Sequence, residues 1–246
     1  MHDPYEFLAT NYDIMIDWPA RIARERPFFE DLFRQTTVGK VLDIGSGTGY
    51  HCRLFAELGA TVIGLDMSVS MLQRARALTP GDNPFFIEGG FQHIHRLKRP
   101  IDLITVLGNT LAHVQDLADL QQALQAMHDT LSPNGLLCVQ VINYDKLLTT
   151  GSHCLPILHR QVDGRDYLFL REHRLLHDHV EFTVITLQHD TDWQQQLERS
   201  IQLPLPRAVL DTALQQAGYT RIRYYSDYDC TPFEPDTANA LIAIAS

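Results

Sequence analysis

Three glycines at alternate positions follow a short apolar run in the segment Val41-Leu-Asp-Ile-Gly-Ser-Gly-Thr-Gly49. Glycines placed directly after a strand let the backbone pass close beneath a ligand. The spacing here is G-x-G-x-G, whereas a dinucleotide-binding loop has G-x-G-x-x-G, and the residue that would complete that pattern is Tyr50. The loop is therefore poorly suited to a pyrophosphate.

Two acidic residues lie where they could bind other parts of a ligand. Asp43, two residues before the first glycine, would repel a pyrophosphate and would suit an ammonium group. Asp66 ends the next apolar run, 21 residues after Gly45, where a carboxylate can accept both hydroxyl hydrogens of a ribose. A ribose, a cation and no polyphosphate describe S-adenosylmethionine. A tight turn would explain the glycines alone, and a helix cap would explain Asp66 alone. The coincidence of Asp43, the three glycines and Asp66 favours cofactor binding.

The elements that must position these residues alternate between short apolar runs and stretches of helical period. Runs over residues 40–45, 61–66, 85–87, 101–107 and 136–142 are typical of buried parallel strands. Stretches over residues 50–58, 68–78 and 117–131 are typical of crossover helices, and Ser68 is placed to cap the second of them. The sequence therefore predicts an α/β domain with a parallel sheet.

The pattern changes to period two after Tyr144. Runs over residues 167–176, 180–187 and 197–203 predict an antiparallel β flap, with a hairpin turn at 177–179. Helical spacing returns over 206–217, stops at Gly218 and is followed by strands over 221–225 and 239–245. We therefore expect an N-terminal helical cap over residues 1–39, a main domain over 40–145 and 204–246, and a flap insertion over 146–203.

These motifs resemble the Rossmann-like, class I S-adenosylmethionine-dependent methyltransferases, and the resemblance covers most of the chain. Residues 41–49 look like the first motif of that family, Asp66 like the acid that ends the second, and residues 221–245 like the terminal hairpin. The likeness implies a seven-stranded, mostly parallel sheet with helices on both faces, plus an inserted antiparallel flap. It also implies that Gly45 and Gly47 pass under the methionine part, and that Met67 lies against the adenine.

The third motif departs from the family pattern. Many members have an acidic or amide side chain there that recognises the adenine amino group, whereas this chain has Glu88-Gly-Gly-Phe91, so backbone at Gly90 and Phe91 would take that role. Near the N-terminus, residues 11–13 and 18–21 resemble a lid helix that approaches the methionine end; a solvated helix face is the alternative. The predicted cofactor-binding residues are Asp43, Gly45, Ser46, Gly47, Asp66, Met67, Gly90, Phe91, Leu107, Tyr12 and Arg21.

The acceptor side carries a closer likeness. Residues 107–113 (Leu-Gly-Asn-Thr-Leu-Ala-His) and 143–145 (Asn-Tyr-Asp) are similar to glycine N-methyltransferases and related small-molecule methyltransferases. The likeness implies that Asn109 and His113 face the sulfonium and the acceptor. A hydroxyl acceptor must lose its proton during attack, and His113 is the nearest candidate for a general base. A turn residue and a helix-start residue remain the structural alternatives for these two positions.

One sequence position bears on which methyl acceptor the protein could bind. An arginine that pairs with the substrate carboxylate directly precedes Asn-Tyr-Asp in glycine N-methyltransferases, and here that residue is Ile142. An aliphatic side chain cannot make a bidentate carboxylate contact. The predicted reaction is therefore an in-line methyl transfer to the nitrogen or oxygen of a small molecule other than glycine, unless Arg171 or Arg174 of the flap replaces the missing arginine.

The composition of the chain argues against several other classes of protein function. The net charge of −10 provides no positive field for nucleic acid or an anionic membrane, and no apolar run approaches the roughly 18 residues of a membrane helix. Four scattered cysteines make neither a zinc nor a redox motif, no metal site is predicted, and a cytoplasmic location is expected. A non-catalytic S-adenosylmethionine-binding module that acts through a protein partner stays open, an NAD-dependent oxidoreductase fails on glycine spacing, and the oligomeric state is undetermined.

Overall fold

The structure is a computed structural model that describes residues 6–97 and 100–246. The main sheet contains β1 (Lys40–Ile44), β2 (Thr61–Asp66), β3 (Phe85–Glu88), β4 (Ile101–Val106), β5 (Leu131–Ile142), β11 (Ile222–Tyr225) and β12 (Ala240–Ala245). A second sheet contains β6 (His153–Cys154), β7 (Leu158–Val162), β8 (Arg165–Leu175), β9 (Val180–His189) and β10 (Trp193–Gln202). The helices are α1 (Glu6–Met15), α2 (Trp18–Gln35), α3 (Tyr50–Glu57), α4 (Val69–Leu78), α5 (Leu117–His128), α6 (Tyr144–Thr150) and α7 (Arg207–Gln216), with 3-10 turns η1 (Phe91–Arg96) and η2 (Thr110–His113).

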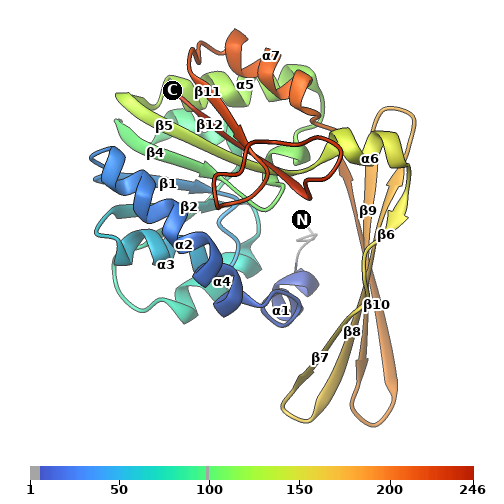
Figure 1. The fold of residues 1–246 in the computed structure, drawn as a ribbon. Coiled ribbons are helices and arrows are strands. Elements are labelled where there is room, and N and C mark those ends of the chain that lie inside the picture. The colour runs from blue at the N-terminus through green and yellow to red at the C-terminus, as the bar shows by residue number, and fades with distance from the viewer. Residues whose placement is uncertain (1–5, 98–99) are drawn as a thin grey trace.

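The main sheet has the order β11-β12-β5-β4-β1-β2-β3 within the described residues, and its strands are parallel except for β12, which is antiparallel to both neighbours. Strand order reverses between β1 and β4, and ligands of open α/β sheets bind at the carboxyl ends of the strands beside such a reversal. The predicted α/β fold with a mostly parallel sheet is confirmed. Figure 1 shows the second, antiparallel sheet projecting away from this body.

Local sequence signals explain most element boundaries. Ser68 caps α4, as predicted, because its Oγ accepts a hydrogen bond from the Met71 backbone N–H at 3.1 Å. One boundary differs from the prediction: α5 ends at His128, and the expected turn over residues 132–135 lies within β5. The register of β5 against β4 shifts there, and a side chain at Gly135 would meet the Ile101 carbonyl oxygen at 3.0 Å. A bulge that requires glycine replaces the simple turn.

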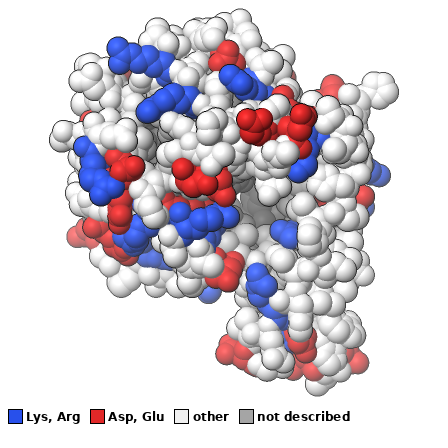
Figure 2. Space-filling view, viewed as in Figure 1, with Lys and Arg blue, Asp and Glu red and all other residues white. Residues whose placement is uncertain are grey.

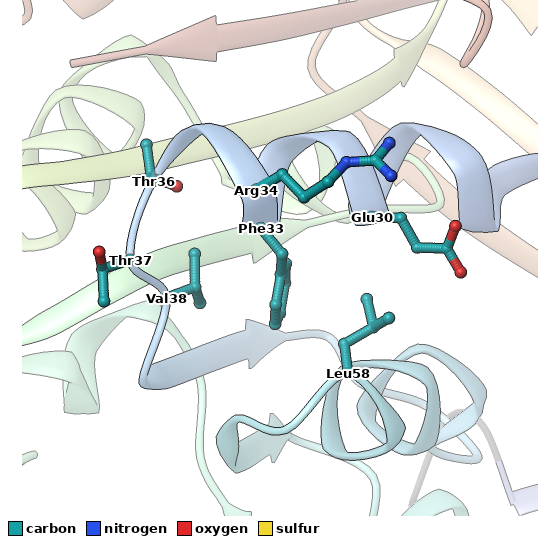
Figure 3. Close-up of a pocket in the computed structure, with 7 residues that line it drawn as sticks. All are labelled: Glu30, Phe33, Arg34, Thr36, Thr37, Val38 and Leu58. Atoms are coloured by element: carbon teal, nitrogen blue, oxygen red, sulfur yellow. The ribbon is translucent and has the colours of Figure 1, made fainter.

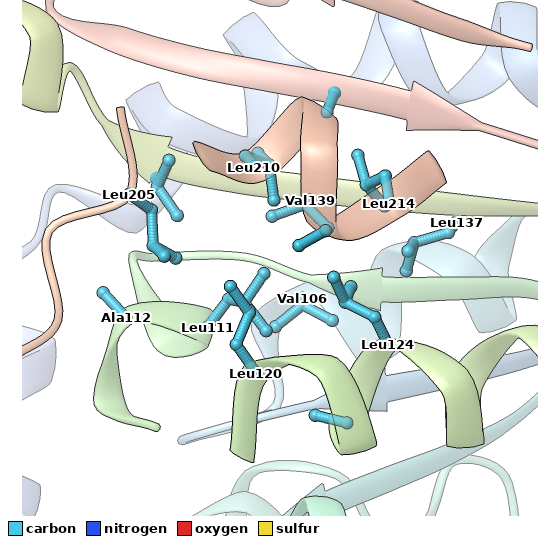
Figure 4. Packing of buried hydrophobic residues seen from close by; sticks show 14 of the residues in the cluster. Val106, Leu111, Ala112, Leu120, Leu124, Leu137, Val139, Leu205, Leu210 and Leu214 are labelled. Carbon is cyan, nitrogen blue, oxygen red and sulfur yellow. The ribbon is translucent and has the colours of Figure 1, made fainter. Parts of the chain in front are cut away.

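Two apolar layers cover the faces of the main sheet. Helices α5 and α7 pack Leu120, Leu124, Leu210 and Leu214 against Val139 and its neighbours on one face (Figure 4). On the other face α2, α3 and α4 bury a separate cluster. In the described part of the chain, no helix is long and apolar enough to cross a membrane. These two packed layers fix the positions of the strands, and the candidate site lies at the carboxyl ends of those strands.

Replacing Leu124 by alanine should destabilise the protein by about 2–5 kcal/mol, because this fully buried side chain would leave a cavity between α5 and the sheet. Leu117→Ala, on the same helix but 58% exposed, is the matched control and should change stability by less than about 0.5 kcal/mol. Chemical denaturation of both variants measures the difference. Equal losses would contradict the packing described for this layer.

Candidate functional site

The glycine loop turns from the end of β1 over the end of β2. The backbone N–H groups of Gly45 and Ser46 donate to the Leu65 carbonyl oxygen at 2.7 and 3.1 Å. Gly45, Gly47 and Gly49 have φ angles of 71°, 52° and 79°, in a backbone region that residues other than glycine rarely adopt. The loop conformation therefore depends on its glycines.

The three glycines face different surroundings. A Cβ at Gly45 would meet the Thr110 side chain at 2.4 Å, and one at Gly49 would meet Phe86 at 2.7 Å. A Cβ at Gly47 would have only the Tyr12 ring within reach, at 3.8 Å. Gly47 thus borders open space, as a residue beneath a ligand should. At Gly45 the Thr110 side chain occupies the side where a Cβ would point, and the predicted ligand contact of this glycine stays a prediction.

Asp66 joins the loop to the next helix. Its Oδ2 accepts the Gly47 N–H at 2.7 Å and its Oδ1 accepts the Ser68 N–H at 2.9 Å. The side chain is only partly buried, and each carboxylate oxygen can accept more than one hydrogen bond. This geometry suits a carboxylate that also receives two ribose hydroxyls, which remains a prediction.

Ser46 offers a further test of whether a polar ligand fits. It is 8% exposed, and its buried Oγ has no hydrogen-bond partner within the described residues. A buried hydroxyl without a partner costs free energy, so such groups are commonly satisfied by a ligand or water. An orphaned hydroxyl beside the open space at Gly47 fits a polar cofactor at this loop.

The expected adenine side is partly revised. Met67 is 66% exposed at the end of β2, and a Cβ at Gly90 would lie 2.9 Å from its Sδ, so the two residues form one apolar surface. The Gly90 N–H, however, donates to Nδ1 of His93 at 3.0 Å, and the Gly90 carbonyl accepts the His93 N–H at 2.9 Å. Gly90 therefore supplies packing, not free backbone groups. The backbone of Phe91, which follows at the start of η1, stays a predicted contact.

Asp43 and Leu107 lie beneath the loop. The Asp43 carboxylate is buried and accepts hydrogen bonds from Thr105 Oγ1 at 2.7 Å and Cys52 Sγ at 3.3 Å, and burial raises its pKa. Leu107 packs in the apolar cluster under α2 and α3, and its carbonyl accepts the Thr110 N–H. These protein contacts support the loop from below, and the predicted cofactor contacts of Asp43 and Leu107 stay predictions.

Helix α1 covers the loop as a lid, and Asp13 holds it there. The Asp13 carboxylate accepts hydrogen bonds from Thr48 Oγ1 at 2.7 Å, Arg74 Nε at 2.9 Å and Trp18 Nε1 at 3.1 Å. These donors come from the glycine loop, α4 and α2. The same lid places Tyr12 over Gly47, and burial raises the Tyr12 pKa. Sequence reasoning missed Asp13, although it ends the Asn-Tyr-Asp segment that identified the lid.

Arg21 lies in a buried ionic cluster at the foot of the lid. Its Nε donates to Glu25 Oε1 at 2.8 Å, and Glu25 Oε2 lies 2.6 Å from His51 Nε2. Burial alone would raise the Glu25 pKa, but the neighbouring His51 and Arg21 hold it below its usual range. Glu25 thus links α2 to the first turn of α3 through His51, and Arg21 pairs with Glu25 within α2. The predicted contact of Arg21 with the methionine end stays a prediction. Glu25 and His51 were missed because nothing in their spacing connects them.

Asn109 is fixed by the protein itself. Its Nδ2 donates to the Tyr144 hydroxyl at 3.0 Å, and its Oδ1 accepts the Ile142 N–H at 3.1 Å. The Tyr144 hydroxyl in turn donates to Gln202 Oε1 at 3.1 Å, at the end of β10. The side chain therefore ties η2 to β5 and to the second sheet, and its predicted catalytic role stays a prediction.

His113 ends η2, four residues after Asn109. Its side chain is exposed to solvent, yet the surrounding protein lowers its pKa by desolvation. A neutral imidazole with access to a ligand suits proton acceptance, so the general-base prediction keeps a chemical basis.

A surface groove lies at the amino-terminal edge of the main sheet, opposite the edge that carries the glycine loop (Figure 3). It is lined by Glu30, Phe33, Arg34, Thr36, Thr37, Val38 and Leu58. These residues surround the amino-terminal start of β1, whereas the glycine loop follows its carboxyl end. This groove belongs to no predicted site. No cluster of three or more potential metal ligands occurs among the described residues.

Comparison with known families decides the class of the domain. A family profile for the methyltransferase domain matches residues 41–135, which span the glycine loop, Asp66 and the start of β5. The chain contains a class I S-adenosylmethionine-dependent methyltransferase domain. Enzymes of this class use S-adenosylmethionine as methyl donor.

Two relatives illustrate the match. The glycine/sarcosine N-methyltransferase of Parasynechococcus marenigrum is 31% identical over 150 residues, covering 60% of this chain and 53% of its own length. That of Halorhodospira halochloris is 26% identical over 234 residues, covering 93% and 83%. The chain spans about half the length of most curated relatives that it matches, including the first.

Solved structures share the whole fold of this methyltransferase domain and its second sheet. An S-adenosylmethionine-dependent methyltransferase from Clostridium acetobutylicum aligns with a TM-score of 0.78 at 17% identity, covering 98% of both chains. CalS10, an amino pentose methyltransferase from Micromonospora echinaspora, aligns with a TM-score of 0.73 at 19% identity, covering 100% of this chain and 97% of its own. At these identities the likeness shows the fold alone.

Asp66→Ala should weaken S-adenosylmethionine binding by roughly 1.5–3 kcal/mol, because it removes a charged acceptor for the ribose and releases the Gly47 N–H. Isothermal titration with S-adenosylmethionine measures the loss. Asp102→Ala is the control, since Asp102 also accepts backbone N–H groups, at Gly39 and Lys40, but at the other edge of the sheet. Unchanged affinity in folded Asp66→Ala would remove this residue from the ribose site.

Gly47→Ala should lower cofactor affinity by about 1–3 kcal/mol, because its methyl group would enter the space above the loop. Gly59→Ala is matched to it: Gly59 also has positive φ and open space, but it lies at the end of α3. Both variants should lose about 1–2 kcal/mol of stability from backbone strain. Only Gly47→Ala should impair titration with S-adenosylhomocysteine, and equal impairment in the two variants would contradict the assignment.

Proposed function

We propose that this protein transfers a methyl group from S-adenosylmethionine to an amine nitrogen of a small molecule. The supporting observation is the glycine loop beneath helix α1, where Gly47 borders open space, the buried Ser46 hydroxyl has no hydrogen-bond partner among the described residues, and Asp66 binds the Gly47 N–H. The relatives named for N-methyl transfer to glycine and sarcosine support nitrogen over oxygen as the accepting atom.

S-adenosylmethionine supplies an electrophilic methyl group on a positively charged sulfur, which an amine lone pair can displace in line. The protein needs to orient both partners and exclude water, and little side-chain chemistry is required. Asp66 and the loop would hold the donor, while Tyr12 and α1 would close over it. Asn109 positions η2 through Tyr144, and His113 would accept the proton that the amine must lose.

The proposal also covers the domain organisation, the kind of substrate and the cellular location of the protein. We assign residues 1–39 to a helical cap, of which residues 1–5 lie outside the described residues, and residues 146–203 to a flap over the acceptor. Residues 40–145 and 204–246 form the proposed cofactor domain. Figure 2 shows acidic and basic side chains intermingled over the visible face, and with a net charge of −10 this supports a small-molecule substrate over nucleic acid. The described cysteines are free thiols, two of them exposed, which supports a cytoplasmic setting.

An acceptor screen that measures S-adenosylhomocysteine release tests the function directly. Release with at least one amine, and its loss in Asp66→Ala, are expected. Tight cofactor binding without turnover of any small amine would instead favour the alternative, a non-catalytic module that acts through a protein partner.

Glycine should be a poor acceptor for the natural protein. Ile142 stands at the end of β5, its N–H is bound to Asn109, and its side chain packs against the main apolar cluster, so it provides no carboxylate contact. Ile142→Arg should admit glycine and sarcosine at a low rate, because the new guanidinium would be only partly satisfied at this half-buried position.

Initial rates of S-adenosylhomocysteine release with both acceptors compare the two proteins. Ile142→Leu is the control for the change of side chain alone and should behave like the natural protein. Efficient glycine turnover by the natural protein would refute this prediction.

A further inference from the structure

Strand β10 forms one edge of the second sheet, which projects from the body of the protein (Figure 1). The strand order β10-β9-β8-β6 ends with it, and β9 is its one strand partner among the described residues. Its residues are exposed except for Glu198, Ser200 and Gln202. The backbone N–H and C=O groups on the side away from β9 are therefore open to pairing with another strand.

This edge lacks the features that usually protect an exposed strand. It contains neither proline nor lysine, and its ten residues pair with β9 without a shift of register. The edge strands of the main sheet, β3 and β11, have only four residues each. Proteins normally shorten, charge, bend or cover such edges, so a long and regular open edge indicates a binding partner.

The two faces of the second sheet have different surroundings. Val184 of β9 packs with Met15 of the lid helix, so its face is turned toward the body, and Arg171 pairs with Val184 on that face. Glu181 lies on the opposite, outer face, where its Oε1 accepts a hydrogen bond from Arg174 at 2.8 Å. Because side chains alternate along a strand, every second residue of β10 lies on this outer face.

Three large apolar side chains of β10 share the outer face. Leu197 pairs with Ile185, and Trp193 and Ile201 lie four residues to either side of it. Trp193, Leu197 and Ile201 are 55%, 45% and 50% exposed, and we name them the apolar stripe. Adjacent apolar side chains this exposed along an open edge are typical of an interaction surface.

The apolar stripe is symmetric about Leu197. A two-fold axis perpendicular to the sheet at this residue would pair β10 with the β10 strand of a second copy in antiparallel orientation. Leu197 would then lie opposite its own counterpart, and Trp193 opposite the counterpart of Ile201. On the same face Gln195 would lie opposite the counterpart of Arg199, whose guanidinium would also reach the Trp193 ring on the diagonal.

Neighbouring registers fit less well. An axis at Glu198 or at Arg199 would place like charges directly opposite each other, which destabilises an antiparallel pair. An axis at Gln195 would place Glu198 opposite Asp192, and an axis one residue before Leu197 would place this leucine opposite a glutamine. Among axes at residues 195–199, only the one at Leu197 pairs the whole apolar stripe with itself and opposes no like charges.

We propose that two copies of this chain associate through β10, so that their second sheets join into one continuous sheet across a two-fold axis at Leu197. Backbone hydrogen bonds would form along the open edge, and burial of the apolar stripe would add apolar contact. The assembly is a closed dimer, because pairing uses the β10 edge of both copies. This inference is independent of the proposed function, since it concerns the edge of the flap and not the cofactor loop.

The mass of the full-length protein in solution tests the association. Sedimentation velocity and light scattering over a wide range of protein concentration should give twice the 28.0 kDa mass of the chain. Leu197→Lys and Leu197→Glu should each raise the dissociation constant of the dimer about ten-fold or more, because like charges would meet at the axis. Val162→Lys is the matched control, since Val162 is an exposed aliphatic residue on β7 of the same sheet, and it should dimerise like the natural protein.

Two further measurements test the register. An equimolar mixture of the Leu197→Lys and Leu197→Glu proteins should form a mixed dimer at least about ten-fold tighter than either variant alone, because opposite charges would meet at the axis. Gln195→Glu should tighten the dimer about two-fold or more, because the new carboxylate would lie opposite Arg199. Circular dichroism checks that each variant is folded. Should the charged variants at Leu197 be unfolded, Leu197→Thr keeps strand propensity and should still weaken the dimer about three-fold or more.

Three results would overturn the inference. They are a natural protein that stays monomeric at every concentration, a dimer that Leu197→Lys and Leu197→Thr leave unchanged, and assembly into species larger than a dimer. A dimer that both charged variants weaken but their mixture does not restore would refute the axis at Leu197. All of these results leave methyl transfer untouched, so they are distinguishable from a failure of the proposed function.

Discussion

The hydrogen bonds from Gly47 and Ser68 to Asp66 constrain everything built at the carboxyl edge of the sheet. They fix the glycine loop relative to α4, and the fixed loop presents Thr48 to Asp13. Asp13 then holds the lid helix, whose Met15 packs against the second sheet. A single carboxylate is thus the first link in a continuous set of contacts from the cofactor loop to the flap.

Buried polar groups beneath the loop are satisfied by one another. Thr105 and Cys52 donate to Asp43, while Arg21 and His51 bind Glu25. Buried charges are tolerated in proteins when they are paired and hydrogen-bonded, and removing one partner is costly. These groups therefore serve as a rigid support, whereas the groups with unused capacity, such as the Ser46 hydroxyl, mark where a ligand fits.

The second sheet divides its chemistry between two faces. Because side chains alternate along a strand, Arg171 and Arg174 face opposite sides although only two residues separate them. One arginine lies toward the body with an unused donor, and the other pairs with Glu181 on the outside. A change of register by one residue would exchange the two faces, so the pairing of β8 with β9 decides which arginine lies toward the body.

The sequence by itself determined the class of the sheet, the order of its elements and the place of the glycine loop. Those features follow from local patterns: apolar periodicity, a G-x-G-x-G run, and a serine that caps the helix after it. The boundary between α5 and β5 was misjudged because a bulge at Gly135 depends on contact with Ile101, a residue on the neighbouring strand.

Only the tertiary structure decided which side chains of the site are free. Asn109 looked available in the sequence, but Tyr144 and Ile142 occupy its amide, and Gly90 is engaged by His93. The face on which each of Arg171 and Arg174 lies likewise follows from strand pairing. Hydrogen-bond satisfaction depends on partners distant in the chain, whereas spacing reports only on neighbours, so the sequence could name the candidates while the fold alone assigned their partners.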